Sequence, residues 1–170
     1  ATGQGYLLAG PRGCGKTSLA RIVAKAVNCL SPNDTTGDPC LSCEQCLLID
    51  QRVHPRVEEI NAAANRGVSD IREKLSTLPL SVPRGKRVYI LDEAHMLTRE
   101  AFSLLLKPME EPPEDVIFIL TTTHPDSIPD TIVSRCALVP ILPLTDEEIR
   151  QVLDATVKAG LAEDDSWRVI

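Results

Sequence analysis

The sequence predicts an α/β fold in which helices cover both faces of a parallel sheet. Several apolar runs are long enough to be strands, and they lack the polar alternation of a half-exposed strand. Segments with helical apolar periodicity lie between those runs, and no internal repeat interrupts the alternation. With 43% hydrophobic residues in 170, the chain can form one packed core, or one domain and the start of another.

The individual elements follow from apolar spacing and from turn residues. The run Tyr6–Ala9 ends at Gly10-Pro11, and the helix after it places Leu19, Ile22 and Val23 on one face. In chain order, we predict a strand at 6–9, a helix at 17–29, an irregular insertion at 30–46, a strand at 57–60, a helix at 62–78, a strand at 88–93, a helix from Thr98, a strand at 116–123, a short strand at 137–142 and a helix that Thr145 and Glu148 begin with a capping box.

A glycine-rich loop lies between the first predicted strand and the first predicted helix. Gly10, Gly15, Lys16 and Thr17 match the pattern G-x4-G-K-[ST], which turns backbone N–H groups toward phosphate oxygens at the start of a helix. Lys16 can reach the β- and γ-phosphates, and the Thr17 hydroxyl can bind magnesium. Cys14, inside the loop, is interpreted as a small filler residue. The alternative is a glycine turn without a ligand.

Two acids end the predicted strand at 88–93. Asp92 is expected to hold magnesium and Glu93 to activate the attacking water, since two carboxylates at a buried strand end need cations nearby. The string Asp92-Glu93-Ala94-His95 also occurs in helicases, which makes a helicase a rival hypothesis. Helicases of that class need a second motor domain, and the sequence shows none.

Four cysteines follow the first helix with the spacing C-x10-C-x2-C-x2-C: Cys29, Cys40, Cys43 and Cys46. Four thiolates favour a closed tetrahedral zinc site that would hold the polar insertion together. An iron–sulfur site, or a site in which His54 replaces Cys29, remains an alternative. Cys136 is expected to be buried and inert.

Two further segments carry candidate site residues. Thr121-Thr122-Thr123 ends a predicted central strand, where a hydroxyl can sense phosphate, although threonine is also a common strand residue. Arg135, in Ser134-Arg135-Cys136, has no evident partner in its segment. It is either a surface ion-pair residue or an arginine finger for a neighbouring subunit.

Charge and hydropathy limit the class of protein. The net charge of −6 argues against nucleic-acid binding through overall charge, so DNA contact would need local patches or partner chains. No apolar run approaches the roughly 18 residues of a membrane span, and the first residues do not resemble a signal peptide. We therefore expect a cytoplasmic protein, and we expect the sequence to be a piece of a longer chain.

Taken together, these segments resemble the bacterial DNA polymerase III clamp-loader family, with the gamma/tau ATPases as the nearest match. The likeness rests on GPRGCGKTSLARIVAKAVNC, the cysteine set, EINAAANRGVSDIRE, VYILDEAHMLT, LLKPMEEPPEDVIFILTTT and IVSRC, in that order. The resemblance implies an AAA+ fold with a five-stranded parallel sheet, residues 1–143, and a zinc-binding insertion at 29–46. It also implies that a helical lid domain begins at 144–170.

The family also implies roles, cofactors and partners. The function would be ATP hydrolysis in a hetero-pentamer that loads the sliding clamp onto primer-template DNA, without polymerising. Catalytic roles would fall to Lys16, Asp92, Glu93, Thr123 (sensor) and Arg135 (finger acting in trans). ATP would be bound by Gly10, Pro11, Arg12, Gly13, Cys14, Gly15, Lys16, Thr17 and Ser18, with magnesium on Thr17 and Asp92 and zinc on the four cysteines.

The chain departs from the family at a few positions. Asn61 and Ala64 stand where an acid and a serine are usual, His124 replaces a common acid, and Pro108 is expected to kink or shorten its helix. Two alternatives remain open: a delta-prime-type subunit that mainly donates the arginine, and a non-catalytic scaffold that binds nucleotide.

Overall fold

Residues 5–64, 68–75 and 85–158, which the computed structural model describes, form a five-stranded sheet. All neighbouring strands are parallel, in the order β2-β3-β4-β1-β5, which confirms the predicted fold class. The strands are β1 (Gly5–Ala9), β2 (Val57–Asn61), β3 (Arg87–Asp92), β4 (Val116–Thr122) and β5 (Cys136–Pro140). The helices are α1 (Lys16–Asn28), α2 (Glu44–Asp50), α3 (Val68–Leu75), α4 (Arg99–Glu110), α5 (Asp130–Val133) and α6 (Asp146–Lys158), with 3-10 turns η1 (Ala94–Met96) and η2 (Pro125–Ser127).

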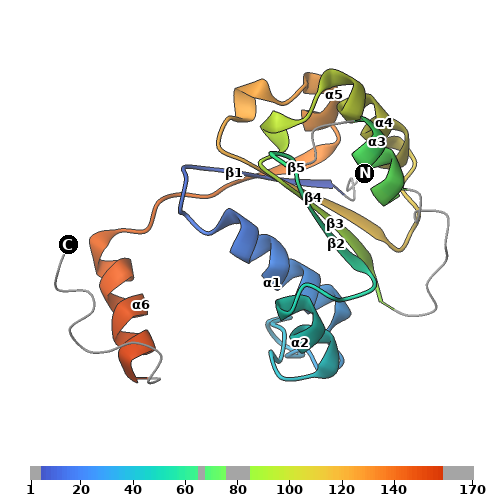
Figure 1. The fold of residues 1–170 in the computed structure, drawn as a ribbon. Coiled ribbons are helices and arrows are strands. Elements are labelled where there is room, and N and C mark those ends of the chain that lie inside the picture. The colour runs from blue at the N-terminus through green and yellow to red at the C-terminus, as the bar shows by residue number, and fades with distance from the viewer. Residues whose placement is uncertain (1–4, 65–67, 76–84, 159–170) are drawn as a thin grey trace.

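Helix α1 covers one face of the sheet (Figure 1). Ala20 and Ala24 are fully buried in its inward stripe, where small side chains let the helix lie close to the strands. They belong to a cluster with Leu8, Ile90 and Ile119 from three neighbouring strands. Successive strand residues point to opposite faces of the sheet. This cluster therefore contains every second strand residue, and the side chains between them pack on the other face.

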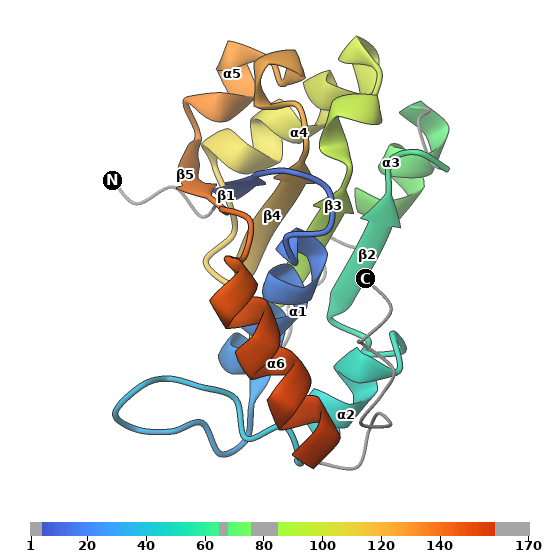
Figure 2. The same ribbon diagram turned by 90° about the vertical axis from the view of Figure 1, so that its left-hand side faces the viewer.

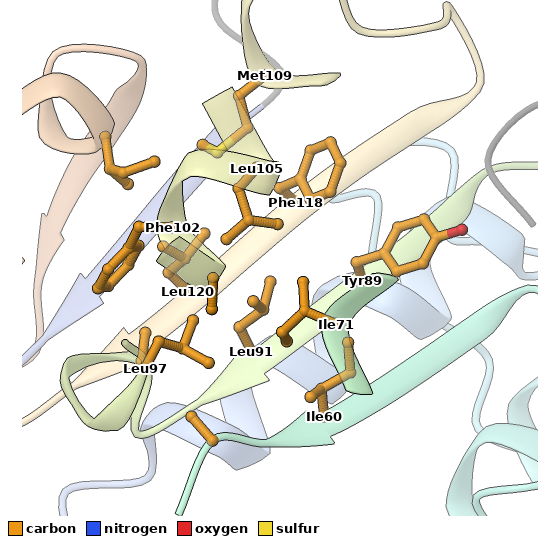
Figure 3. Packing of buried hydrophobic residues seen from close by; sticks show 14 of the residues in the cluster. Ile60, Ile71, Tyr89, Leu91, Leu97, Phe102, Leu105, Met109, Phe118 and Leu120 are labelled. Carbon is orange, nitrogen blue, oxygen red and sulfur yellow. The ribbon is translucent and has the colours of Figure 1, made fainter. Parts of the chain in front are cut away.

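Helices α3, α4 and α5 cover the opposite face, and Figure 3 shows the packing there. Leu105 of α4 is fully buried against the sheet, where the rings of Tyr89 and Phe118 stack with centroids 5.4 Å apart. Both faces are thus apolar, which explains the continuous apolar runs of the inner strands. The cluster comprises Leu7, Ile60, Ala62, Ile71, Tyr89, Leu91, Ala94, Leu97, Ala101, Phe102, Leu105, Met109, Val116, Phe118, Leu120, Ile128 and Ile132.

The helix predicted at 62–78 begins later than expected. Ala62 N still donates to Asp92 O of the neighbouring strand at 2.9 Å, and Ala63 N donates to Asn61 Oδ1 at 2.8 Å. An asparagine side chain that captures a backbone N–H two residues on makes a turn, which competes with helix formation. Among the described residues, the helix of this region is α3, Val68–Leu75, and residues 65–67 and 76–78 lie outside the described part of the chain.

The insertion predicted to be irregular contains a helix. Residues 44–46 belong to α2, which buries Cys46 and Ile49, and the expectation of irregular structure up to residue 46 is wrong. Cys46 lies three residues before Ile49 and packs as an apolar residue on the same face of the helix. If Cys46 is interpreted only as a metal ligand, the apolar periodicity of the helix is not recognised. An ion pair of 2.5 Å between Lys25 and Asp50 joins α2 to α1.

Helix α4 does not end at Pro108. Thr98 caps its start by accepting a hydrogen bond from Ala101 N at 3.2 Å, and the helix continues through Pro108 to Glu110. The missing proline N–H removes one bond from the last turn only, while Glu111 N still donates to Lys107 O at 3.1 Å. The expectation that Pro108 shortens the helix is therefore wrong.

The last described helix, α6, stands clear of the sheet in Figure 1, and in Figure 2 it lies in front of α1. The predicted capping box is present, since Thr145 N donates to Glu148 Oε2 at 2.8 Å and Glu148 N donates to Thr145 Oγ1 at 3.3 Å. None of its residues is buried, and Ile149 and Val152 are exposed. Among the described residues, no helix has both the length and the apolar character needed to cross a membrane.

Truncation of the core tests this packing. We expect Leu105→Ala to lower the free energy of unfolding by about 2–5 kcal/mol, because the substitution removes apolar contact and leaves a cavity. Leu142, which is 76% exposed, supplies the control, and Leu142→Ala should change stability by less than about 0.5 kcal/mol. Urea unfolding followed by circular dichroism measures both values. Equal effects of the two substitutions would contradict the packing described here.

Candidate functional site

The loop between β1 and α1 curves around a cavity of about 250 Å³. Gly13 and Gly15 have φ angles of 82° and 86°, in the left-handed region that glycine adopts without strain. Gly10 is needed for a different reason, because a Cβ atom there would lie 2.1 Å from Ile141 O. The cavity is lined by Arg12, Gly13, Gly15, Lys16, Thr17, Ser18 and Glu93.

Lys16 is held at the loop by carbonyl groups. Its Nζ donates to Gly10 O at 3.0 Å and to Pro11 O at 2.6 Å, and the residue is only 6% exposed. These bonds satisfy an ammonium group that would be costly to bury without partners. Cys14 Sγ also donates to Pro11 O, at 2.9 Å, and so closes the loop on itself.

Asp92 connects three segments at the same edge of the sheet. Its Oδ1 accepts a hydrogen bond from Thr17 Oγ1 at 2.7 Å and another from Thr121 Oγ1 at 2.5 Å. Because β1, β3 and β4 are parallel, their carboxyl ends meet at one edge, which brings the loop after β1 to the acid that ends β3. Carboxylate and hydroxyl oxygens are the ligands that magnesium prefers.

Glu93 leaves the line of the strand and reaches the cavity. Its backbone is left-handed, with φ 51° and ψ 47°, and its N–H donates to Thr121 Oγ1 at 3.3 Å. A left-handed glutamate is uncommon and marks a backbone that the surroundings hold in place. Asp92 and Glu93 thus point to different partners although they are adjacent in sequence.

Hydroxyl and imidazole groups surround the Glu93 carboxylate. Thr123 Oγ1 donates to Glu93 Oε2 at 3.3 Å and lies 2.9 Å from His124 Nδ1. His95 Nδ1 lies 3.4 Å from the same carboxylate oxygen and 3.1 Å from Thr122 Oγ1. Each hydroxyl of the threonine triplet therefore contacts two groups around the Asp92 and Glu93 acids.

Several of these neighbours were not predicted as site residues. The threonine triplet and the Asp-Glu-Ala-His string are evident in the sequence, but nothing in the sequence distinguishes the separate contacts of Thr121, Thr122 and His95. Arg21 of α1 was not predicted either, and it bonds Glu59 through Nε at 2.9 Å and Nη2 at 2.7 Å. This carboxylate raises the pKa of Arg21 above its usual value and anchors α1 to the edge strand β2.

The four cysteines of the insertion meet at one point. Their Sγ atoms all lie within 4.8 Å of one another, those of Cys29 and Cys43 are 3.9 Å apart, and all four thiols are free. Four sulfurs around one tetrahedral zinc ion at about 2.3 Å would lie roughly 3.8 Å apart, so the set fits such an ion. Cys29 follows α1 directly, and Cys46 comes from α2.

Backbone N–H groups point at two of these sulfurs. Cys40 N donates to Cys29 Sγ and Cys43 N to Cys40 Sγ, both at 3.3 Å. Hydrogen bonds from the backbone of Ser42 and Cys43 lower the pKa of Cys40 to about 6, whereas burial raises the pKa of Cys46 to about 12. A metal ion would favour the thiolate form of all four, including Cys46.

His54 does not join the cysteines. It is buried, its Nε2 lies 2.8 Å from Gln45 Oε1, and its Nδ1 accepts a hydrogen bond from Arg56 N at 3.1 Å. Burial lowers the pKa of His54 and favours the neutral ring. Of the two ligand sets weighed from the sequence, the structure brings together the one with Cys29.

Arg135 has partners within its own chain, contrary to the expectation from its segment. Its Nη1 donates to Thr131 O at 2.5 Å, and its Nη2 pairs with Glu110 Oε1 at the end of α4. The arginine lies between α5 and β5, with 30% of its side chain exposed. Cys136, next to it, is half-buried rather than buried, and burial raises the pKa of its thiol to about 11, which disfavours reactivity.

Comparison with known proteins supports one family. A sequence model of the family described as "DNA polymerase III, delta subunit" matches residues 1–145. The chain is 47% identical over 153 residues to the DNA polymerase III subunit gamma/tau of Mycoplasma pneumoniae, covering 88% of this chain and 22% of that protein. It is 52% identical over 134 residues to the tau subunit of Bacillus subtilis, covering 77% and 23%. The chain thus spans less than a quarter of these relatives.

Solved structures show the same fold. A gamma subunit-related protein of Thermotoga maritima is similar with a TM-score of 0.58 and 22% identity, over 95% of this chain and 49% of that one. The AAA domain of FIGL-1, crystallised with ADP, is similar with a TM-score of 0.59 and 19% identity, over 92% and 49%. The chain therefore has the AAA+ fold and belongs to the DNA polymerase III clamp-loader family, as do the gamma/tau and tau subunits to which it is similar.

Proposed function

We propose that this chain is the nucleotide-binding part of an ATP-hydrolysing motor subunit of a bacterial clamp loader. The observation that carries the proposal is the 2.7 Å hydrogen bond between Thr17 and Asp92, beside a cavity lined by Lys16 and Glu93. Phosphoryl transfer on such a loop needs a cation for the phosphates, oxygen ligands for magnesium and a base for water. All three lie around one cavity, and the gamma/tau relatives support the same function.

Each residue then has one task. The backbone N–H groups of residues 12–18 bind phosphate oxygens, and the ammonium group of Lys16 stabilises the negative charge of the β- and γ-phosphates. Thr17 and Asp92 would hold magnesium, which when bound neutralises charge on the transferred phosphoryl group. Glu93 accepts the proton of the attacking water, and Thr123 directs its carboxylate by donating a hydrogen bond.

Arg135 is proposed to complete the ATP site of a neighbouring subunit. A planar guanidinium suits the charge that spreads over the transferred phosphate. The side chain bonds Thr131 O and Glu110 but stays partly exposed, as a group offered to a partner requires. Partners would be the other subunits of a hetero-pentamer, the sliding clamp and primer-template DNA.

Two alternatives make different predictions. A delta-prime-type subunit would use Arg135 and have no working ATP site of its own, and a scaffold would bind nucleotide without hydrolysing it. Lys16, Thr17 and Glu93 line one cavity, and Asp92 accepts a hydrogen bond from Thr17, so the complete set favours the motor. A third hypothesis, a helicase, receives no support from the gamma/tau relatives.

The cysteine cluster is proposed to hold a structural zinc ion. Its four sulfurs leave no open ligand position, and the loop at 30–43 consists mostly of exposed residues that cannot form a core. The compact arrangement, with all sulfurs within 4.8 Å, favours one ion over a multi-iron cluster.

We propose the boundary between the AAA+ domain, residues 1–143, and a lid domain near residue 144. Helix α6 has no buried residue and leaves Ile149 and Val152 exposed, as expected of a helix whose packing partners belong to another domain. Adenine and lid contacts would then come from the longer protein.

Glu93→Gln tests the motor. The amide keeps the size of the side chain but accepts no proton, so we expect turnover in the assembled complex to fall by about 100-fold or more while ATP binding is retained. Phosphate release and nucleotide titration measure the two quantities. Glu111→Gln, an exposed acid after α4, is the control and should leave turnover unchanged. Unchanged turnover of the Glu93 variant would rule out Glu93 as the base, and a wild-type complex that binds ATP without turnover would favour the scaffold.

Arg135→Ala tests the role in trans. In complexes that mix this variant with wild-type subunits, we expect about 10³-fold slower hydrolysis at the site of the subunit that faces the variant. ATP binding by the variant itself should not change. Arg150→Ala, an exposed arginine of α6, controls for loss of charge. If the rate of hydrolysis followed only the number of subunits with an intact Lys16, and did not depend on Arg135 of the neighbouring subunit, the trans role would be ruled out.

Elemental analysis tests the metal. We expect about one zinc per chain, and we expect Cys43→Ser to lose it and to lower the melting temperature, because metal binding contributes to the folding free energy. Cys136→Ser should keep the zinc, since Cys136 lies outside the cluster. The zinc assignment would be overturned if the protein contained iron, or if the metal-free protein were as stable as the zinc-bound protein.

A further inference from the structure

His124 lies two residues after the end of β4 and is exposed, and the proposed function gives it no task. Its Nδ1 lies 2.9 Å from Thr123 Oγ1, and its ring lies 4.7 Å from that of His95, tilted by 55°. Its own N–H donates to Thr122 Oγ1 at 3.0 Å, which fixes the backbone at this point. The imidazole is therefore held beside the hydroxyl that contacts Glu93.

The proton count at Thr123 decides the direction of these bonds. A hydroxyl group has one proton to donate, and an ionised carboxylate can only accept. For Thr123 to donate to Glu93 Oε2, at 3.3 Å, its other neighbour must supply a proton to the hydroxyl oxygen. His124 Nδ1 does so when the ring carries its proton on that nitrogen.

We propose that His124 is a positioning residue for ATP hydrolysis: by donating from Nδ1 to Thr123 Oγ1, it turns the single hydroxyl proton of Thr123 toward the Glu93 carboxylate. The inference rests on the proposed role of Glu93. An ionised carboxylate at position 124 would have no proton to donate, and it would compete with Glu93 for the threonine proton. A histidine protonated on Nδ1 removes that competition.

His95 supports the same arrangement from the other side. Its Nδ1 lies 3.4 Å from Glu93 Oε2, and its ring packs against that of His124. Glu93 Oε2 is thus approached by a hydroxyl from one segment and by an imidazole from another, so its position is set from two directions. Fixing a base within a few tenths of an ångström is how such contacts contribute to rate.

Substitutions that differ only in donor or acceptor character test the proposal in the full-length subunit, assembled in its complex. Asn places an amide N–H near the position of Nδ1, whereas Asp places a carboxylate there. We expect His124→Asn to retain turnover within about twofold, and His124→Asp to lower kcat about tenfold with KM for ATP unchanged. Asp126→Asn, a nearby exposed acid, is the control and should leave kcat unchanged.

A second background separates positioning from a general structural effect. With Thr123→Val the hydroxyl is absent, and His124→Asp should then cause no further loss of kcat. Wild-type turnover of His124→Asp, equal losses for Asn and Asp, or a loss that persists with Thr123→Val would each overturn the inference. Glu93→Gln keeps the two proposals apart: if it abolishes turnover while His124→Asp does not lower it, the motor function stands and the role of His124 falls.

Discussion

The site depends on one oxygen atom, Asp92 Oδ1, which accepts hydrogen bonds from Thr17 and Thr121. These two hydroxyls come from the first turn of α1 and from the end of β4, so the carboxylate joins the cradle to the centre of the sheet. A parallel register that slipped by one residue would turn Asp92 to the opposite face and break both bonds. The apolar packing on the two faces keeps that register, because a slip would move each buried strand side chain to the opposite face of the sheet.

Helix α1 connects the two chemical regions of the chain. It begins in the phosphate loop and ends at Cys29, about 20 Å away for a helix of its length. At its far end, Asn28 Oδ1 accepts a hydrogen bond from Lys86 N at 3.0 Å, and a Cβ atom on Gly85 would lie 2.5 Å from the same oxygen. The cysteine cluster and this contact hold the end of the helix that is remote from the cavity, while Asp92 holds the other.

Features that depend on local sequence pattern could be predicted from the sequence. Strand positions, the phosphate loop and the cap at Thr145 follow from periodicity and turn residues. Partners brought by topology could not be predicted: the bond between Thr121 and Asp92 and the pair of Arg135 with Glu110 join residues far apart in the chain. Predictions were also wrong where one residue has two structural or chemical roles. Cys46 serves both as candidate ligand and as helix core, and Asn61 ends a strand by making a turn.

The strand order has a consequence for how the chain assembles during synthesis. Gly5 of β1 pairs with Phe118 of β4 and with Cys136 of β5, so of the five described strands the first in the chain lies between the fourth and the fifth. At ribosomal speed, β1 waits on the order of 10 s before either neighbour exists. The cysteine cluster closes over a short stretch and can form in that interval, whereas the phosphate loop takes its final place only when the sheet closes around β1. Nucleotide binding is therefore acquired only after β4 and β5 have been made.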